Sequence, residues 1–480
     1  MHKLICIFLL AVIFISCGNK SEIIPETTAV DPVNTDVTMV SEIPNIADDD
    51  YNNRDFVIYY IYWSLFKDYY FSDSQNGDII NDACYDRTVL IEEKLNISIT
   101  TIPTTDPFEQ INKIRASVLS NDPTYDLLLL HNSTSMTTFI ADRIVYNWND
   151  IPVIDMNKSY WNQSVSKNLN IHGMLPFASN DFILPDVNSI FFHTQLFDDL
   201  SLENPYDLVT GGKWTWDKLI QMASGASADI DGDGVFTADD RYGFVGEFSW
   251  QFGSVPTSCN QYAITIDSNG IPQINLNTPV MMNLVEKINH LITADNISYT
   301  WGFSVATDPN SGGIPPVRFD SGRALFYMVP LSLAKTFRAA DLDFGILPLP
   351  KYNEAQNNYI TLNWAGFMAV PFVVQDVELI GKVVELLGYY NKEYVVPVFY
   401  DILLGQKISR NDRSNEMLNI IFKNTVYDLG VVLGSDFYAF ISNLINSKND
   451  FASFYAANEN SLQKVIDDYY NAHVEYNLIK

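Results

Sequence analysis

Five carboxylates are crowded into one short segment of the chain, Asp229 to Asp240, which reads DIDGDGVFTADD. Side chains at this spacing bring hard oxygen ligands to a single Ca²⁺. Without a cation, the carboxylates would repel one another. The segment therefore predicts one calcium ion. Its ligands would come from Asp229, Asp231, Asp233, the backbone carbonyl of Val235, Thr237 and Asp240, with Gly234 at the sharp turn.

The spacing matches the calcium loop of an EF-hand, with one difference. The last position holds Asp240 instead of the longer bidentate Glu, as in dockerin-like loops. A dockerin module would need a second copy of this loop, and the sequence has none. The alternative is an acidic surface turn without metal. We expect a structural calcium ion that fastens an insertion.

The N-terminus has the layout of a secretory signal. Lys3 precedes an apolar stretch from Leu4 to Ile15, which ends at Ser16-Cys17-Gly18. This stretch is too short to span the membrane, since a spanning helix needs about 20 residues. A Cys after a small residue at this place resembles a bacterial lipobox, although Phe14 stands where Leu is usual. We expect a signal peptide at 1–16 and lipidation of Cys17. The alternative is simple cleavage near Ser16.

Residues 17–52 are expected to form a flexible tether. Between about Lys20 and Asp50 the sequence is rich in Ser, Thr, Pro, Asp and Glu and has no aromatic residue, so it buries too little apolar area to order itself. A lipid anchor followed by a tether would hold a folded body at the extracellular face of the cell membrane.

The rest of the chain has the composition of a large globular protein. The full sequence is 47% hydrophobic and 13% aromatic, which is enough for two lobes. Its formal net charge of -29 argues against nucleic acid as a partner. Beyond the signal segment only Cys84 and Cys259 remain; their spacing does not require a disulfide, and no cysteine cluster suggests zinc.

Apolar strands alternate with helices at the start of this body. Strands are expected at Phe56 to Tyr62, Ile97 to Ile102 and Tyr125 to Leu130, and helices at Ala83 to Leu95 and Phe108 to Leu119. Such continuous apolar strands indicate an α/β fold with a mostly parallel sheet. Ligands of these sheets bind beyond the carboxyl ends of the strands. The loops at Trp63 and at His131, Asn132 and Ser133 should therefore face a cleft.

Longer segments carry a resemblance to a known family. They are NWNDIPVIDMNKSYWNQSV, then GMLPFASNDFILPDVNSIFFHTQLFDDLSLENPYDLVTGGKWTWDKL, and then VRFDSGRALFYMVPLSLAKTFRAADLDFGILPLPKYNEAQNNYIT. In this order they resemble the extracellular solute-binding proteins of family 1, particularly a clostridial-type branch. The resemblance covers roughly Val57 to Gly430.

The resemblance implies a two-lobed, periplasmic-binding-protein-like (Venus flytrap) fold with crossing hinge strands. The first lobe would hold 53–185 and 317–372, and the second lobe 186–316 and 373–480, including the calcium loop 229–240. It further implies that the lobes close over a small-molecule ligand, expected to be a sugar, for delivery to the permease subunits of an ABC transporter.

Sugar recognition needs flat aromatic faces and a few placed polar groups. Tryptophans in or beside predicted loops could supply the faces: Trp63, Trp250, Trp301 and Trp364. The polar candidates are His131, Asn132, Asp186, Asn188 and Asn363. Each tryptophan could equally well pack in the core, as we expect of Trp214 and Trp216. Thr215 should cap the helix that begins at Trp216.

Two rival functions remain open at this point. A sensor that reports ligand occupancy to a membrane kinase could use the same fold. An extracellular carbohydrate-active enzyme could share the aromatic cleft and would need two carboxylates across it. With 58 Asp and Glu in the chain, such a pair could occur by chance. No common hydrolase motif is present, and we expect a binding protein without catalytic residues.

Overall fold

The computed structural model describes most of the chain beyond its N-terminal segment. The chain divides into two units, Met1–Ser41 and Glu42–Lys480, and all described residues belong to the second. The signal segment 1–16, Cys17 and the tether up to residue 41 lie outside them. The described ranges are 42–61, 69–131, 137–247, 251–294, 296–301, 319–337, 343–404, 412–433, 435–446 and 450–478.

The end of the expected tether belongs to the folded body, so the tether prediction is wrong for residues 42–52. Ile46 is buried in the core. The Asp49 N–H donates to the carbonyl of Lys94 at 3.0 Å, and the Asp49 carboxylate pairs with Lys382 at 2.8 Å. The polar composition of this segment suggested disorder, because composition does not show that its acidic residues form ion pairs with lysines of the folded body.

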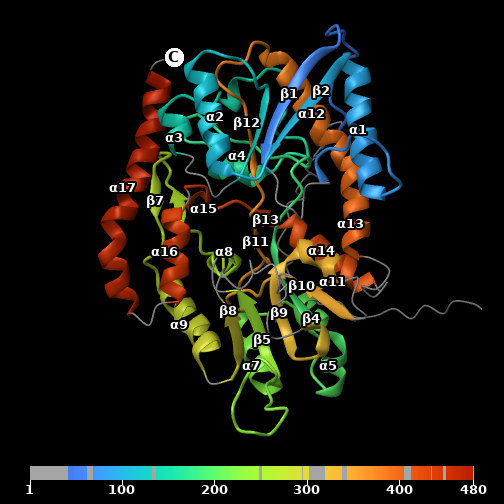
Figure 1. Cartoon of the computed structure of the whole chain (residues 1–480). Helices are drawn as coiled ribbons and strands as arrows, with labels where there is room; N and C mark the ends of the chain where they lie inside the picture. The colour runs from blue at the N-terminus through green and yellow to red at the C-terminus, as the bar shows by residue number, and fades with distance from the viewer. Residues whose placement is uncertain are drawn as a thin grey trace, which may run out of the picture. The chain divides into compact units, whose positions relative to one another are not determined.

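The first sheet has four strands in the order β12-β3-β1-β2 (Figure 1). Strand β1 runs parallel to both β2 and β3, whereas β12 is antiparallel to β3. Helices α1 and α2 both contact β2. The strands and helices expected in this part of the sequence are confirmed. Their bounds are β1 (Arg54–Ile61), α1 (Ile79–Leu95), β2 (Ile97–Thr104), α2 (Pro107–Leu119), β3 (Leu127–Leu130) and β12 (Phe367–Ala369).

Local sequence signals fix where these helices begin and end. Asp78 caps α1 by accepting hydrogen bonds from the N–H groups of Ile80 and Asn81, and Asp106 caps α2 in the same way. Helix α1 ends at Asn96, whose φ of 47° is left-handed and suits an Asn. The chain then enters β2 directly.

The second sheet has five strands in the order β10-β4-β9-β5-β8. Strand β5 is parallel to β9 and β8, while β4 is antiparallel to β9 and β10. Two small two-stranded sheets, β11 with β13 and β6 with β7, complete the set. The bounds are β4 (Asn188–His193), β5 (Tyr242–Glu247), β6 (Ile264–Ile266), β7 (Pro272–Ile274), β8 (Ser298–Trp301), β9 (Ala324–Pro330), β10 (Phe344–Leu347), β11 (Thr361–Leu362) and β13 (Thr425–Val426).

Two extended segments, 178–188 and 361–369, connect the two sheets, and we call them the crossing segments. They lie antiparallel, with bridges between Ala178 and Met368 and between Val187 and Asn363. A third connection is helical: α12 (Val377–Tyr390) continues through a π-helical turn, η5 (Asn391–Val395), into α13 (Val396–Leu404). Figure 1 shows this rod running alongside both sheets.

The sheets divide the chain differently from the predicted lobe boundaries. The range 317–372 was expected in the first lobe, but β9 and β10 pair with β4 in the second sheet, and only β12 joins the first. Conversely, α12 was expected in the second lobe but contacts α1. The apolar run of β9 is fully buried because its side chains pack into both core clusters, while β4 and β5 pair with its two edges. The chain therefore returns to the first sheet later than expected, at 361–369.

The remaining helices cover these sheets. Helix α7 begins at Trp216, and Thr215 caps it by accepting from the Lys218 N–H, as predicted. Trp214 and Trp216 are fully buried core residues. The bounds are α3 (Thr137–Ala141), η2 (Trp148–Asp150), α4 (Gln163–Asn168), α5 (Thr194–Asp199), α6 (Pro205–Thr210), α7 (Trp216–Ala226), α8 (Ser254–Ser258), α9 (Pro279–Thr293), η3 (Phe319–Ser321), η4 (Leu331–Leu333), α11 (Ala334–Phe337), α14 (Asp412–Lys423), α15 (Leu429–Val432), α16 (Ser435–Asn446) and α17 (Phe451–Leu478).

Two further features bear on the sequence-based expectations. Cys84 and Cys259 are both buried free thiols, so they do not form a disulfide in this structure. Among the helices of the described ranges, none combines the length and the apolar character needed to cross a bilayer.

Candidate ligand-binding site

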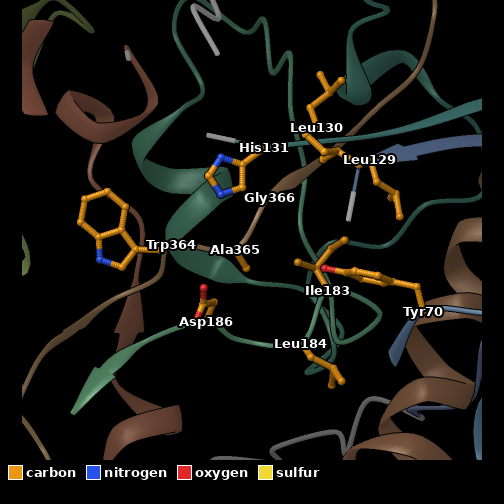
Figure 2. Close-up of a pocket in the computed structure, with 11 residues that line it drawn as sticks. Tyr70, Leu129, Leu130, His131, Ile183, Leu184, Asp186, Trp364, Ala365 and Gly366 are labelled. Atoms are coloured by element: carbon orange, nitrogen blue, oxygen red, sulfur yellow. The ribbon is translucent and has the colours of Figure 1, made fainter. Parts of the chain in front are cut away.

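A hollow lies where β1 and β3 end, between the first sheet and the crossing segments (Figure 2). Ligands of open α/β sheets sit beyond the carboxyl ends of the strands, so this is the place that the strand order predicts. We call it the strand-end hollow. Its lining consists of Ile61, Tyr70, Leu129, Leu130, His131, Ile183, Leu184, Asp186, Trp364, Ala365 and Gly366.

The strand-end hollow is narrow in this structure. Its free space is about 30 Å³, enough for roughly two water molecules. A sugar ring cannot enter a space of that size. The hollow as it stands is therefore smaller than a sugar ring.

Asp186 supplies the charge in the hollow. Its carboxyl group points into the space in front of Ala365 and Trp364 (Figure 2). Its Oδ1 atom is buried and has no hydrogen-bond partner. Burial raises the pKa of this carboxyl from 3.8 to about 7. Asp186 is thus a hydrogen-bond acceptor that is already desolvated and lacks a partner.

Trp364 forms one wall of the hollow and is held firmly. Its indole Nε1 donates to Ser254 Oγ at 2.7 Å, and its backbone N–H donates to the carbonyl of Asp186 at 2.7 Å. The side chain also packs with Leu362 and Val431. Packing and site lining, which were alternatives at the level of sequence, are therefore combined in this residue.

His131 is the first residue after β3 and lies across the hollow from Trp364, with its imidazole directed toward the indole (Figure 2). Burial lowers the pKa of His131 to about 4. The ring is therefore neutral at physiological pH. A neutral imidazole offers one donor and one acceptor, which suits a hydroxyl group better than an ion.

Tyr70 is a lining residue that the sequence analysis missed. Its ring packs against Phe182 at 5.7 Å, and burial raises the pKa of its hydroxyl. The buried Arg87 donates to the Tyr70 carbonyl and to Asn391 Oδ1, and it stacks over Phe182 at 5.0 Å. Arg87 thereby ties the loop after β1 to the π-helical turn. The aromatic triplet at 69–71 was the only signal in the sequence.

Gly366 permits the close approach of the second crossing segment to β3. A Cβ atom at this position would stand 2.0 Å from the carbonyl oxygen of Leu130. Any other residue would push β12 away from β3 and widen the hollow between these two strands.

Two predicted residues serve the framework and do not line the strand-end hollow. Asn363 is buried; its Oδ1 accepts from the N–H groups of Asp186 and Ala365, both at 3.0 Å, and its Nδ2 donates to the Tyr427 hydroxyl at 2.8 Å. Asn188 is fully buried at the start of β4, where its Nδ2 donates to Ser254 Oγ at 2.8 Å. Asn363 fastens the crossing segments, and Asn188 shares the anchor of Trp364.

Other predicted residues cannot be placed in the same detail. Trp63, Asn132 and Trp250 lie outside the described residues. Trp301 ends β8 at the edge of the second sheet, opposite Glu247, and only its main chain is described. The structure therefore brings together His131, Asp186 and Trp364 from the predicted set.

The expected calcium loop lies between α7 and β5. Ligand atoms of Asp229, Asp231 and Asp233 stand within 4.8 Å of one another. Oxygens that bind one Ca²⁺ at about 2.4 Å stand at most about 5 Å apart, so these three carboxylates fit the ion. Asp240 is not in this group: its two carboxylate oxygens accept from the N–H groups of Ile230 and Thr237 at 2.8 and 2.7 Å.

Comparisons with known proteins identify the fold. No family model matches the chain, and no curated protein sequence does either. The cyclic alpha-maltosyl-1,6-maltose binding protein of Arthrobacter globiformis has a TM-score of 0.57 at 14% identity, over 87% of this chain and 99% of that one. UgpB of Mycobacterium tuberculosis, solved with glycerophosphocholine, has a TM-score of 0.57 at 14% identity, over 83% and 98%.

A third structure agrees with these two. The ABC substrate-binding protein Lmo0181 of Listeria monocytogenes, in complex with cycloalternan, has a TM-score of 0.54 at 12% identity, over 88% of this chain and all of that one. At such identities the likeness shows the fold alone. The prediction of a two-lobed, periplasmic-binding-protein-like α/β fold is confirmed.

Proposed function

We propose that this chain is an extracellular binding protein that captures a carbohydrate in the strand-end hollow and delivers it to an ABC importer. The observation that carries the proposal is the set of three groups around one small space: the unpartnered carboxyl of Asp186, the anchored indole of Trp364 and the neutral imidazole of His131. Two of the similar structures, from Arthrobacter and Listeria, carry cyclic oligosaccharide ligands in their names.

Each group has a role in holding a sugar. The apolar face of a pyranose ring can lie against the indole of Trp364. Asp186 accepts hydrogen bonds from ring hydroxyls, and these bonds are strong when the carboxylate is ionised and shielded from water. The neutral imidazole of His131 can exchange a hydrogen bond with a hydroxyl group. The lining contains no group that would pair with a negatively charged ligand, within the part of the chain that the structure describes.

Lobe movement about the crossing segments would couple binding to transport. The narrow hollow must open for entry, and a ligand that contacts both crossing segments and the first sheet favours the closed form. Closure then presents a surface made from both lobes to the permease subunits. We propose capture and release without chemical turnover.

The finer features of the proposal concern the surroundings of the body. Lipidation of Cys17 would hold the protein at the outer face of the membrane, with the residues up to 41 as the tether. One structural Ca²⁺ would be held by Asp229, Asp231 and Asp233, where it would offset the repulsion among their carboxylates. No residue of the calcium loop lines the strand-end hollow, so the ion would have no direct part in ligand contact.

Calorimetric titration of the full chain with neutral oligosaccharides tests the function. Maltose, maltotetraose and cyclic tetrasaccharides are suitable probes, with glycerophosphocholine and a polyamine as other ligand classes. We expect a saccharide to bind, and Asp186→Asn to weaken it about ten-fold, as loss of a charge-assisted hydrogen bond does. The matched control is Asp198→Asn, at an exposed position of α5. Binding of only the polyamine would contradict the carbohydrate assignment, and unchanged affinity in Asp186→Asn would contradict the site.

A further inference from the structure

A second, larger hollow lies on the other side of the first crossing segment. It is bounded by α4, residues 179–185 of the crossing segment, α13, α14 and β13. Its free space is about 870 Å³, against about 30 Å³ in the strand-end hollow. Ile183 and Leu184 line both hollows, so this part of the crossing segment is the wall between them. We call the larger space the amide hollow.

Side-chain amides dominate the lining of this hollow. Five of them already make hydrogen bonds within the fold: Asn162, Gln163, Asn180, Asn363 and Asn424. The other two are Asn358 and Asn419. Within the described structure, the side chains of Asn358 and Asn419 make no hydrogen bond and are exposed. An amide group offers donors and an acceptor together, and hydroxyl groups also need both. An ion would need only one of the two.

Aromatic side chains provide an apolar wall. Phe399 and Tyr400 of α13 line the hollow together with Phe422 of α14. The rings of Tyr400 and Phe422 pack edge to face at 4.8 Å, and those of Phe399 and Phe422 lie 6.3 Å apart. A fixed aromatic surface beside free amides is the combination that holds a sugar ring by its apolar face and its hydroxyls.

The charges around the hollow nearly cancel. Asp181 contributes a carboxyl group, and its pKa is raised to about 7 by burial. Lys392 is already engaged, since it pairs with Glu42 at 3.6 Å and donates to Ser159 Oγ. Lys423 is exposed at the end of α14. Among the described residues, Asp181 and Lys423 are charges of opposite sign without an ion-pair partner, so a strongly charged ligand would be attracted by one and repelled by the other. A neutral ligand can donate hydroxyl hydrogens to Asp181 and accept from Lys423.

We propose that the amide hollow is a second binding site, for a neutral, hydroxyl-rich molecule of the size of a short oligosaccharide. The hollow has a volume typical of small-molecule sites. Its lining combines the two free amides of Asn358 and Asn419, an aromatic wall and one acceptor carboxyl. The site is separate from the strand-end hollow and stands independently of the proposed transport function.

Equilibrium dialysis of the full chain with labelled glucose, cellobiose, maltotetraose and xylotetraose tests this site. The blocking variant is Asn419→Trp, because this exposed residue can take a large side chain that fills the hollow without disturbing the core. The matched control is Asn460→Trp, on the exposed side of α17 and in neither hollow. If Asn419→Trp lowers the melting temperature, the isosteric variant Asp181→Asn tests the same hollow without adding a large side chain.

We expect at least one of these saccharides to bind at a site that Asn419→Trp weakens at least ten-fold and Asp181→Asn weakens several-fold, while Asn460→Trp and Asp186→Asn leave that site unchanged. Saccharide binding lost only in Asp186→Asn would overturn the second site and leave the transport proposal intact. Saccharide binding lost only in Asn419→Trp would support the second site and overturn the proposal that the strand-end hollow captures the transported saccharide. No binding of any saccharide in the panel would overturn the amide hollow as a carbohydrate site.

Discussion

The two hollows lie on one crossing segment and differ in almost every physical respect. The strand-end hollow holds about 30 Å³ and presents one carboxyl, one imidazole and one indole. The amide hollow holds about 870 Å³ and presents many neutral amides beside an aromatic wall. Each receives one aspartate from the same segment, Asp186 and Asp181, and burial raises the pKa of both to about 7.

The difference shows how enclosure determines the binding free energy that a hydrogen bond to a polar group contributes. In the narrow hollow, Asp186 Oδ1 is buried without a protein partner, so a correctly placed hydroxyl that displaces the few waters there gains a strong hydrogen bond. In the open hollow, Asn358 and Asn419 are hydrated when no ligand is present, and each hydrogen bond to a ligand replaces one to water. We therefore expect few, strong contacts at the first site and many, weak contacts at the second.

The largest effect should come from removing the wall of the narrow hollow. Trp364→Ala removes a buried indole, its hydrogen bond to Ser254 and its packing with Leu362 and Val431. We expect about 3 kcal/mol less stability, as for other buried Trp to Ala changes, and saccharide affinity at the strand-end hollow reduced about 100-fold. Urea unfolding and calorimetry measure the two effects. Binding at the amide hollow should be unchanged; an equal loss there would show that the hollows are not separate.

The wall between the hollows can be tested through Asn363. Asn363→Ala leaves the N–H groups of Asp186 and Ala365 without their partner. It also removes one of the hydrogen bonds of the Tyr427 hydroxyl, which keeps its contact with Ser179. We expect the free energy of unfolding to fall by about 3 kcal/mol, since each orphaned buried group costs about 1 kcal/mol or more. Asn419→Ala, at an exposed lining position of the amide hollow, should change it by less than about 0.5 kcal/mol. Similar values for the two variants would mean that Asn363 does not fasten the crossing segments.

The pH dependence of stability should reveal the desolvation of Asp186. Its pKa is raised from 3.8 to about 7 in the folded protein, so the folded state holds a proton that the unfolded state releases between these values. Through this group, the free energy of unfolding falls as the pH rises from about 4 to 7. Asp186→Asn should therefore be more stable than the parent chain at pH 8, and this gain should vanish near pH 4.

We expect a gain of about 2 kcal/mol at pH 8, roughly half of what the full shift corresponds to, because water reaches the half-buried side chain. Urea unfolding from pH 4 to pH 8 measures it. Asp181→Asn should show the same sign with a smaller amplitude, since Lys392 partly offsets the burial of Asp181. A gain at pH 4 in either variant would contradict the raised pKa.

The sequence predicted the regular elements of the first sheet well, because β1, β2 and β3 are continuous apolar runs and α1 and α2 have capping aspartates. It could not show which strands β9 pairs with, because the residues of an apolar strand do not specify its neighbours in the sheet. The boundary near residue 42 was missed for a related reason. Ile46 and Asp49 are ordered by contacts with residues far along the chain.

The site was predicted in part for the same physical reason. Residues after strands could be found by position, as His131 was. Asn188 and Asn363 were expected to contact ligand, but their side chains are engaged with Ser254 and Tyr427, which only the fold brings near. Tyr70 lines the hollow because Arg87 fixes its backbone, and nothing in the order of residues reveals that contact.

The last prediction concerns the calcium loop, and it separates stability from binding. Ca²⁺ that binds only the folded chain should raise its stability by mass action, by about 2.7 kcal/mol at 100 times the dissociation constant. For a chain of this size that corresponds to a few degrees in melting temperature. Asp233→Asn should abolish the rise, because it removes one of the three converging carboxylates. Asp198→Asn, outside the loop, should retain it.

Saccharide affinity at either hollow should change less than about two-fold when calcium is chelated, because no residue of the loop lines them. Scanning calorimetry with and without chelator, followed by titration with saccharide, measures both quantities. If calcium does not change the melting temperature, the segment is an acidic surface turn that binds no calcium. A large loss of affinity on chelation would mean that the loop holds the second sheet in the position from which it closes on the ligand, so that the two hollows could no longer be treated as independent of it.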